Sequence, residues 1–221
     1  MSLGGSLLTR RQDAGSYRRY AEAFRKLKAK GHELVVVCGG GRPARQYISI
    51  AKELGATGEL QDRLGILMTH VNATLLIAAL GEDADPRVHR RGSEIRRHGI
   101  KKILVGGGHM PKSSTDYRAA LFAKAINADL IVNATDVSGV YDKNPKTHPD
   151  AKKIPKLTFS ELEKIIRANV NQAPGEYGLF DLKALHIAEK LGIPVVIIDG
   201  SDPEEIIRAV EGRHSGTLIS R

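Results

Sequence analysis

One stretch, residues 103–116, constrains the fold more than any other part of the chain. It begins with the apolar run Ile103–Val105, which is typical of a buried strand. Gly106 to Gly108 follow at once, and a helical pattern begins at Asp116. Glycine lets the backbone turn sharply and lets a ligand approach main-chain N–H groups, and a helix N-terminus favours negative charge. The stretch is therefore built like a phosphate-binding turn, although glycine turns also end strands for purely structural reasons.

Strand-like and helix-like segments alternate along the whole chain. Strands are expected at 1–3, 34–38, 103–105, 130–132, 194–198 and 217–219. Helices are expected at 17–27, 43–54, 61–80, 116–126, 160–167, 181–192 and 203–210, with a possible capping box of Ser160 and Glu163. The alternation predicts an α/β fold, a three-layer αβα sandwich around a mainly parallel central sheet.

Glycine-rich turns end three of these strands, at Gly4–Gly5, Gly39–Gly41 and Gly106–Gly108. In open α/β sheets, ligands bind outside the carboxyl ends of the strands. Three such turns meeting at one edge would make a site for several phosphates. None of them matches the P-loop or the dinucleotide-binding glycine pattern, so the phosphates are expected in a different fold.

The longest expected helix, residues 61–80, has two different faces. One carries an apolar stripe of Leu60, Leu64, Leu67, Val71 and Leu75. The other is small and polar and consists of Asp62, Gly65, Thr69 and Asn72. A polar face is ordinary on a surface helix, and an acid near a helix start also complements the helix dipole.

Composition narrows the classes of partner. The single cysteine, Cys38, follows three valines and excludes an internal disulfide; it is expected to pack as a small buried hydrophobe. The net charge of +9 would suit either nucleic acid or small phosphorylated ligands. The densest basic segment, 87–102, lacks interleaved aromatics, and the chain has no tryptophan, so we expect a solvated helix face and no nucleic-acid partner. No apolar run reaches membrane-spanning length and no signal peptide opens the chain, which favours a cytoplasmic protein without a membrane partner.

Taken together, the motifs resemble the amino-acid kinase family and, within it, uridylate (UMP) kinases of archaeal type. The motifs that carry the resemblance are Gly4–Gly5–Ser6, residues 39–45, Asp62 with 72–76, and residues 114–116, 135–141, 181–184 and 216–217. Each is weak alone, but their order and spacing cover nearly the whole chain. The resemblance implies a carbamate kinase-like fold in one domain, 1–221, with an acceptor-binding lobe at about 1–127 and an ATP-binding lobe at about 128–221. It also implies ATP-dependent phosphorylation of UMP to UDP in pyrimidine nucleotide biosynthesis, and a homo-oligomer, a hexamer built from dimers.

The resemblance also assigns site residues. ATP would be contacted by Gly4, Gly5, Ser6, Gly41, Arg45, Thr135, Tyr141 and Asn144. UMP would be contacted by Gly40, Asp62, Gly108, His109, Met110, Pro111, Lys112, Ser113, Ser114 and Thr115, with Asp62 accepting hydrogen bonds from the ribose hydroxyls. The catalytic set would be Arg42, Arg45, Asp116 and Asp181. No cluster of metal-ligating residues is evident in the sequence, so Mg²⁺ is expected to arrive with ATP and no separate metal site is expected.

Two departures from the family pattern leave alternatives open. Bacterial relatives carry a lysine where Ser2 stands, and Arg42 and Arg45 are the candidates for the missing positive charge. The acceptor loop 108–116 lacks the usual Gly-Thr-x-Pro-Gly-His pattern, and no specific role follows for His109. The chain could therefore be another small-phosphate kinase of the same fold, such as an isopentenyl phosphate kinase, or a nucleotide-binding regulator or storage protein without catalysis.

Overall fold

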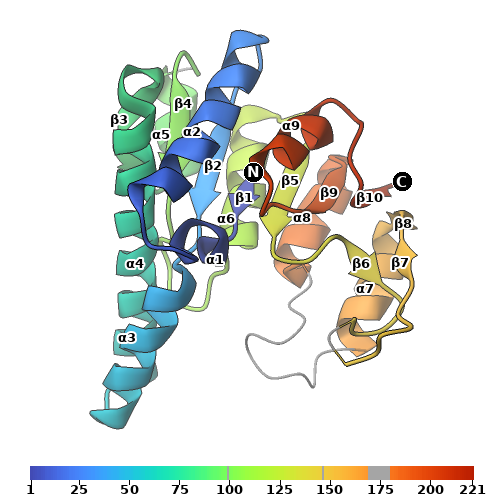
Figure 1. Cartoon of the computed structure of the whole chain (residues 1–221), viewed down its shortest axis with the longest axis horizontal. Coiled ribbons are helices and arrows are strands. Elements are labelled where there is room, and N and C mark those ends of the chain that lie inside the picture. The colour runs from blue at the N-terminus through green and yellow to red at the C-terminus, as the bar shows by residue number, and fades with distance from the viewer. Residues whose placement is uncertain (99, 146, 169–179) are drawn as a thin grey trace.

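The computed structural model describes residues 1–98, 100–145, 147–168 and 180–221, which build a twisted central sheet between two layers of helices (Figure 1). The sheet contains β1 (Ser2–Leu3), β2 (Val35–Cys38), β3 (Ala84–His89), β4 (Ile103–Gly106), β5 (Ile131–Thr135), β8 (Lys156–Thr158), β9 (Val195–Asp199) and β10 (Thr217–Ser220). Their order is β3-β4-β2-β1-β5-β9-β10-β8. β10 runs antiparallel to β9, and the other described pairs of this sheet are parallel. The predicted αβα sandwich with a mainly parallel sheet is confirmed.

Each face of the sheet carries its own helices. α2 (Ala14–Ala29), α4 (Gly58–Leu80) and α9 (Pro203–Val210) cover one face. α5 (Gly92–His98), α6 (Thr115–Ile126), α7 (Phe159–Ala168) and α8 (Leu182–Leu191) cover the other. Successive strand residues supply the two cores in turn: Val36 and Cys38 pack under α2 and α4, and Val35 and Val37 pack under α5 and α6. Cys38 is fully buried, as predicted, and burial raises the pKa of its thiol.

Two short elements lie where the sequence indicated otherwise. The basic segment 87–102 does not form one solvated helix, because its first part belongs to the edge strand β3 and only then does α5 begin. In β3 only Ala84 and His89 are buried, and Pro86 is tolerated because the strand is at an edge, so the apolar pattern of a strand is absent. Gly5 opens a short helix, α1 (Gly5–Thr9), where the sequence indicated only a glycine-rich turn.

The region between β5 and α7, for which the sequence predicted no strand, contains a second small sheet. β6 (Val140–Tyr141) and β7 (Lys153–Ile154) pair as a small antiparallel sheet. The capping box of α7 lies two residues before the predicted one: Glu161 accepts from the backbone N–H of Thr158, whose hydroxyl accepts from the N–H of Glu161. A loop expected at 171–178 lies outside the described residues.

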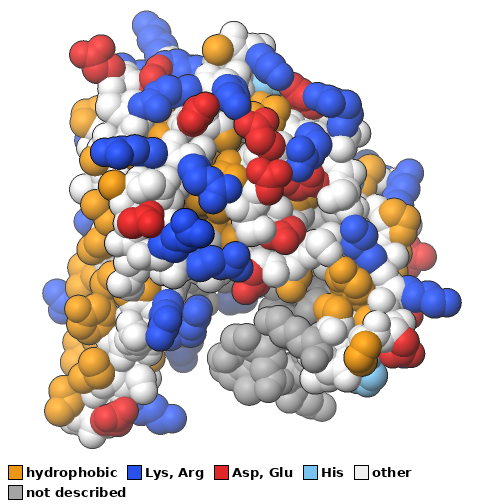
Figure 2. Space-filling model, in the orientation of Figure 1, with side chains coloured by type: hydrophobic (Ala, Val, Ile, Leu, Met, Phe, Trp, Pro, Cys, Tyr) orange, Lys and Arg blue, Asp and Glu red, His pale blue; other side chains and the backbone are white. Residues whose placement is uncertain are grey.

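The two faces of α4 are oriented opposite to the expectation. Its polar residues Thr69 and Asn72 are buried, whereas Leu67, Val71 and Leu75 of the apolar stripe are 50%, 47% and 45% exposed. α3 (Gly41–Glu53) packs beside α4, and Figure 2 shows hydrophobic side chains gathered along this side of the molecule. The segment Gly58–Asp83 is also long and apolar enough to cross a membrane by length and composition alone, contrary to the expectation from run lengths. Its inward polar face instead holds the loops described below.

Candidate active site

The first two glycine turns touch each other at the carboxyl ends of β1 and β2. A Cβ on Gly5 would overlap the backbone of Gly39 and Gly41, and one on Gly41 would lie 2.5 Å from the carbonyl oxygen of Gly5. Gly41 also has φ +69°, which other residues rarely adopt. The Thr9 hydroxyl joins the two turns, donating to the carbonyl of Gly5 (2.9 Å) and accepting from the N–H of Arg42 (3.2 Å). The N-termini of α1 and α3 are thereby held side by side, with their free amides at one edge of the sheet.

The polar face of α4 holds the second glycine turn in place by a hydrogen bond. The amide nitrogen of Asn72 donates to the carbonyl of Gly39 (2.7 Å), and its oxygen accepts from the hydroxyl of Tyr17 (2.9 Å). Asn72 is 2% exposed, and both ends of its side chain are hydrogen-bonded, as a buried amide requires. Asn72 therefore supports the turn, a role that the polar pattern of the helix did not reveal.

The same face of α4 holds the third glycine turn. The N–H of Gly108 donates to the hydroxyl of Thr69 (2.7 Å), and the imidazole Nε2 of His70 lies 2.6 Å from the Gly108 carbonyl. Burial lowers the pKa of His70, so the ring is expected to be neutral and to donate at Nε2. Further along, the N–H of Lys112 donates to Asp62 Oδ2 (3.1 Å). The loop from Gly108 to Lys112 is thus attached to α4 at both ends.

A cavity of about 290 Å³ opens between this loop and α4. It is lined by Ile48, Asp62, Gly65, Ile66, Thr69, Gly108, Met110, Pro111, Lys112, Ser113 and Thr115. The structure therefore brings together most of the residues predicted to bind the acceptor. Gly40, His109 and Ser114 are the predicted residues that do not line it. Ile48, Gly65, Ile66 and Thr69 were not predicted as site residues, although the small polar face of the helix was a usable signal for Gly65 and Thr69.

The start of α6 is joined to the start of α8 by two hydrogen-bonded side chains. Ser114 caps α6 by accepting from the N–H of Tyr117 (3.0 Å), and its hydroxyl donates to Asp181 Oδ2 (2.7 Å). Asp181 caps α8 through its other oxygen, which accepts from the N–H groups of Lys183 (2.7 Å) and Ala184 (3.2 Å). The N-termini of α6 and α8 are therefore joined, with one carboxylate held between them.

Asp116 is a second carboxylate at this place. The hydroxyl of Ser2, in the central strand β1, donates to Asp116 Oδ1 (2.7 Å). Burial, with a further contribution from the negative charge of Asp181, raises the pKa of Asp116 to about 6. Neither carboxylate forms a salt bridge with any of the described residues. The pair therefore concentrates negative charge that a bound cation would neutralise.

The remaining predicted residues surround this edge of the sheet. Thr135 ends β5, which pairs directly with β1. Tyr141 lies on β6 with its hydroxyl 2.7 Å from that of Ser138, and Asn144 is buried just beyond. Arg42 and Arg45 lie one turn apart at the start of α3 with exposed side chains.

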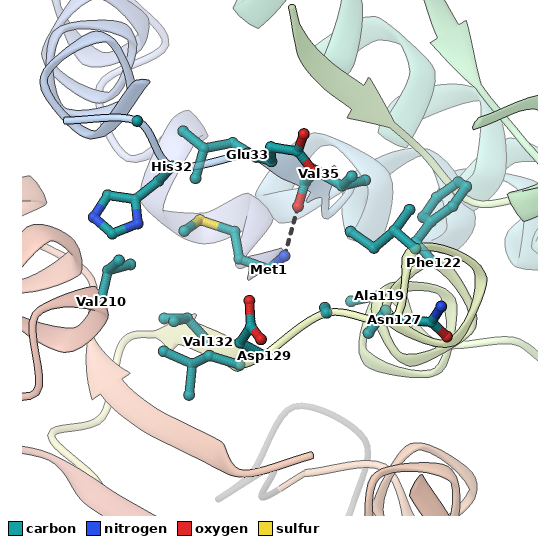
Figure 3. Close-up of a pocket in the computed structure, with 16 residues that line it drawn as sticks. Met1, His32, Glu33, Val35, Ala119, Phe122, Asn127, Asp129, Val132 and Val210 are labelled. Atoms are coloured by element: carbon teal, nitrogen blue, oxygen red, sulfur yellow. Dashed lines mark hydrogen bonds between the residues drawn. The ribbon is translucent and has the colours of Figure 1, made fainter. Parts of the chain in front are cut away.

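A larger cavity, of about 490 Å³, lies at the other end of the sheet (Figure 3). It is lined by the starts of the strands and the end of α6, and the amino group of Met1 crosses it to the carbonyl of Val35 (2.5 Å). Helix C-termini repel anions, so this cavity does not suit phosphates. The glycine turns, the paired carboxylates and the smaller cavity mark the opposite edge as the candidate active site.

Comparison with known proteins agrees with this geometry. Residues 1–199 match the family model described as the amino acid kinase family. The chain is 41% identical to the uridylate kinase of Methanothermobacter thermautotrophicus over 99% of this chain and 97% of that protein. It is 42% identical to the uridylate kinase of Hyperthermus butylicus over 93% of this chain and 91% of that one.

Among solved structures, the uridylate kinase from Archaeoglobus fulgidus is similar, with a TM-score of 0.88, 37% identity, and coverage of 99% of this chain and 98% of that one. These likenesses confirm the carbamate kinase-like fold that the sequence motifs implied. The chain belongs to the amino acid kinase family.

Proposed function

We propose that this protein is a UMP kinase, which transfers the γ-phosphoryl group of ATP to UMP and releases UDP and ADP. The observation that carries the proposal is Asp62, a carboxylate on the wall of the small cavity opposite the loop from Gly108 to Thr115. A carboxylate is suited to accept hydrogen bonds from the two ribose hydroxyls. Isopentenyl phosphate has no hydroxyls to offer it, so this residue favours a nucleotide acceptor. The full-length similarity to uridylate kinases supports the same assignment.

The two substrates would meet above the central strands. UMP would occupy the half formed by residues 1–127, and ATP would lie over the half formed by 128–221, with Thr135, Tyr141 and Asn144 around the adenosine. Gly4, Gly5, Ser6, Gly40 and Gly41 would direct backbone N–H groups at the phosphates. Phosphoryl transfer depends mainly on positioning and on stabilising charge in the transition state, which preorganised amides and helix N-termini can do.

The arginines of α3 would supply the mobile positive charge. Ser2 stands where a lysine would be needed, and its hydroxyl is occupied by Asp116. Arg45 would reach the ATP phosphates, and Arg42 would act in the transition state. Both side chains are exposed and lie one helical turn apart, and neither forms a salt bridge with a described residue, so they can move over the glycine turns.

Asp116 and Asp181 fit a magnesium ion that arrives with ATP. No group of three or more potential metal ligands occurs among the described residues, whereas Mg²⁺ on nucleotides commonly needs one or two carboxylates. Bound there, Mg²⁺ would neutralise charge on the phosphates. Ser2 and Ser114 would hold the two carboxylates in place, each by a 2.7 Å hydrogen bond.

A coupled ADP-release assay across UMP, CMP, dUMP and isopentenyl phosphate tests the proposal. We expect turnover with UMP to exceed that with each of the others. Preference for isopentenyl phosphate would show a different small-phosphate kinase. Nucleotide binding without ADP release would show a regulator or storage protein. The paired carboxylates Asp116 and Asp181 argue against that alternative, because they suit a magnesium ion bound to ATP.

We further propose a cytoplasmic homo-oligomer in which a second copy covers the apolar side of α3 and α4. Beside the exposed stripe of α4, Tyr47 and Ile50 of α3 and Leu54 at its C-terminal end are also exposed. Exposed apolar side chains that gather on one side of a molecule often mark an interface, and the family resemblance favours a hexamer built from dimers. Light scattering should give the wild type a molar mass larger than that of one chain, and Leu67→Glu should lower that mass. An unchanged mass in the variant would place the interface elsewhere.

A further inference from the structure

Arg118 of α6 is a buried cation that the proposed reaction does not use. The residue is 4% exposed, and its Nε and Nη2 atoms donate no hydrogen bond to any described residue. An unpaired guanidinium in such a place is costly, because its hydration is lost and nothing replaces it. Native structures seldom retain such a group without a partner, which can be a bound ligand.

Further positive groups lie beside it. His109 does not line the acceptor cavity, and its Nε2 accepts from Nε of Arg91 (3.3 Å), the residue just before α5. Burial and the charges of Arg118, Arg91 and Arg90, in that order, lower the pKa of His109. One guanidinium group thus donates a hydrogen bond to this imidazole, and the charges of two more act on it, although the sequence assigns His109 no specific role.

The negative charge nearby is insufficient to balance them. Glu94 is the acid close to this group, and it already accepts from the N–H of Arg90 (3.1 Å). Three arginines against one glutamate leave an excess of positive charge. Guanidinium forks pair best with planar or tetrahedral oxyanions, and a phosphate dianion matches the excess.

We propose that Arg118, Arg91 and His109 form a second anion site, which binds the phosphate group of a small ligand on the outer side of the acceptor loop. The site differs from the cavity at Asp62, since Arg91, Arg118 and His109 are all absent from the lining of that cavity. The ligand is either inorganic phosphate or a phosphate ester, and the two can be separated experimentally.

The test is isothermal titration of the full chain in buffer free of phosphate and sulfate. UMP and a non-hydrolysable ATP analogue are present at saturation, so that the proposed active site is filled. Inorganic phosphate, pyrophosphate and ribose 5-phosphate are titrated separately. We expect one equivalent per chain for at least one of them, and the tightest of the three identifies the source of the phosphate group.

Variants then locate the site. Arg118→Met keeps the length of the side chain without its charge and should weaken binding at least tenfold. Arg91→Met should weaken anion binding several-fold, and it should not impair folding because Arg91 is exposed. Arg213→Met is the matched control, because Arg213 is exposed and paired with Glu211. Equal affinity in wild type and both site variants would overturn the proposal, as would the absence of binding in the wild type.

Thermal unfolding gives a second, independent readout. Without anion, Arg118→Met should melt at a higher temperature than the wild type, because it removes an unpaired buried charge. Added anion should raise the melting temperature of the wild type and leave that of Arg118→Met almost unchanged. If Arg118 had only a packing role, anion would shift both proteins equally, and the proposal would be wrong.

Discussion

Replacing Asp116 by asparagine should stabilise the protein, by an amount that depends on pH. Asparagine keeps the shape of the side chain and an oxygen that can accept from Ser2, but it cannot ionise. Burial first, and Asp181 second, raise the pKa of Asp116 from 3.8 to about 6. At roughly 1.4 kcal/mol per pKa unit, the ionised carboxylate costs the folded state about 3 kcal/mol at most. Asp116 is not fully shielded from solvent, so the measured value should fall below this bound.

The sign follows from proton linkage. Below the unfolded pKa of 3.8, both the folded and the unfolded chain hold the proton, and the carboxylate costs nothing. Between there and about 6, the unfolded chain loses the proton first, so folding becomes less favourable as the pH rises. Above about 6 the full cost is present. The stabilisation in Asp116→Asn should therefore be at most about 1 kcal/mol at pH ~4.5 and at most about 3 kcal/mol at pH ~8.

Equilibrium urea unfolding followed by far-UV circular dichroism measures the difference, since the chain has no tryptophan to serve as a fluorescent probe. Asp85→Asn is the control, for which we expect a change in the free energy of unfolding of the opposite sign. A hydrogen bond from Arg87 is the main cause that lowers the pKa of Asp85 to about 2, so this variant should lose stability at pH ~8. Destabilisation of Asp116→Asn at pH ~8, or a gain independent of pH, would refute the burial of an uncompensated carboxylate. We expect the more stable Asp116→Asn variant to be less active, because the destabilising charge is the one assigned to the magnesium ion.

Three further results are expected. Arg45→Ala should cost roughly 10²-fold in kcat/KM for ATP, and Arg42→Ala should lower kcat with little change in KM; near-normal kcat in both would move the missing charge to another residue or subunit. Gly41→Ala should lower the melting temperature much more than Gly212→Ala does. Both glycines have positive φ, but of the two only Gly41 would place a Cβ against other atoms. Equal decreases in melting temperature would mean that the first two glycine turns are not packed as described. EDTA should abolish ADP release without changing the circular dichroism spectrum, and unfolding on chelation would instead indicate a structural metal.

The sheet and its glycine turns could be predicted because their physical causes are local. A run such as Val35–Cys38 followed by glycines has few alternatives to a buried strand that ends in a tight turn. The same turns pointed to phosphates before any geometry was known. The candidate site could be placed at this edge for the same reason, since loops at the carboxyl ends of parallel strands lie close together.

The orientation of α4 could not be predicted, because a helical pattern shows which residues share a face but not what covers that face. The apolar stripe with Leu67 and Val71 suggested a core contact, yet it faces outward and the polar side with Thr69 holds the loops. In the proposed assembly a second copy would cover this stripe, and one sequence does not distinguish such a surface from one that faces the core.

The cluster around Arg118 was missed for a related reason. One arginine in a chain of net charge +9 is normally solvated, whereas Arg118 is buried on α6, a helix that packs against α5. Likewise, Ser2 was noted as the place of a missing lysine, whereas its hydrogen bond to Asp116 depends on β1 lying beside the start of α6. Long-range contacts of this kind are not encoded in local spacing.

The most direct test of the proposed function is the preference for UMP over dUMP in the wild type and in Asp62→Asn. Asparagine can still accept from the N–H of Lys112, so the loop stays attached while the carboxylate is lost. We expect the wild type to prefer UMP in kcat/KM by roughly tenfold or more, the scale of one hydrogen bond to a charged group. Asp62→Asn should lose most of that preference, with KM for ATP unchanged. An identical UMP-to-dUMP ratio in the two proteins would contradict ribose recognition by Asp62, and with it the assignment of this cavity to the nucleotide acceptor.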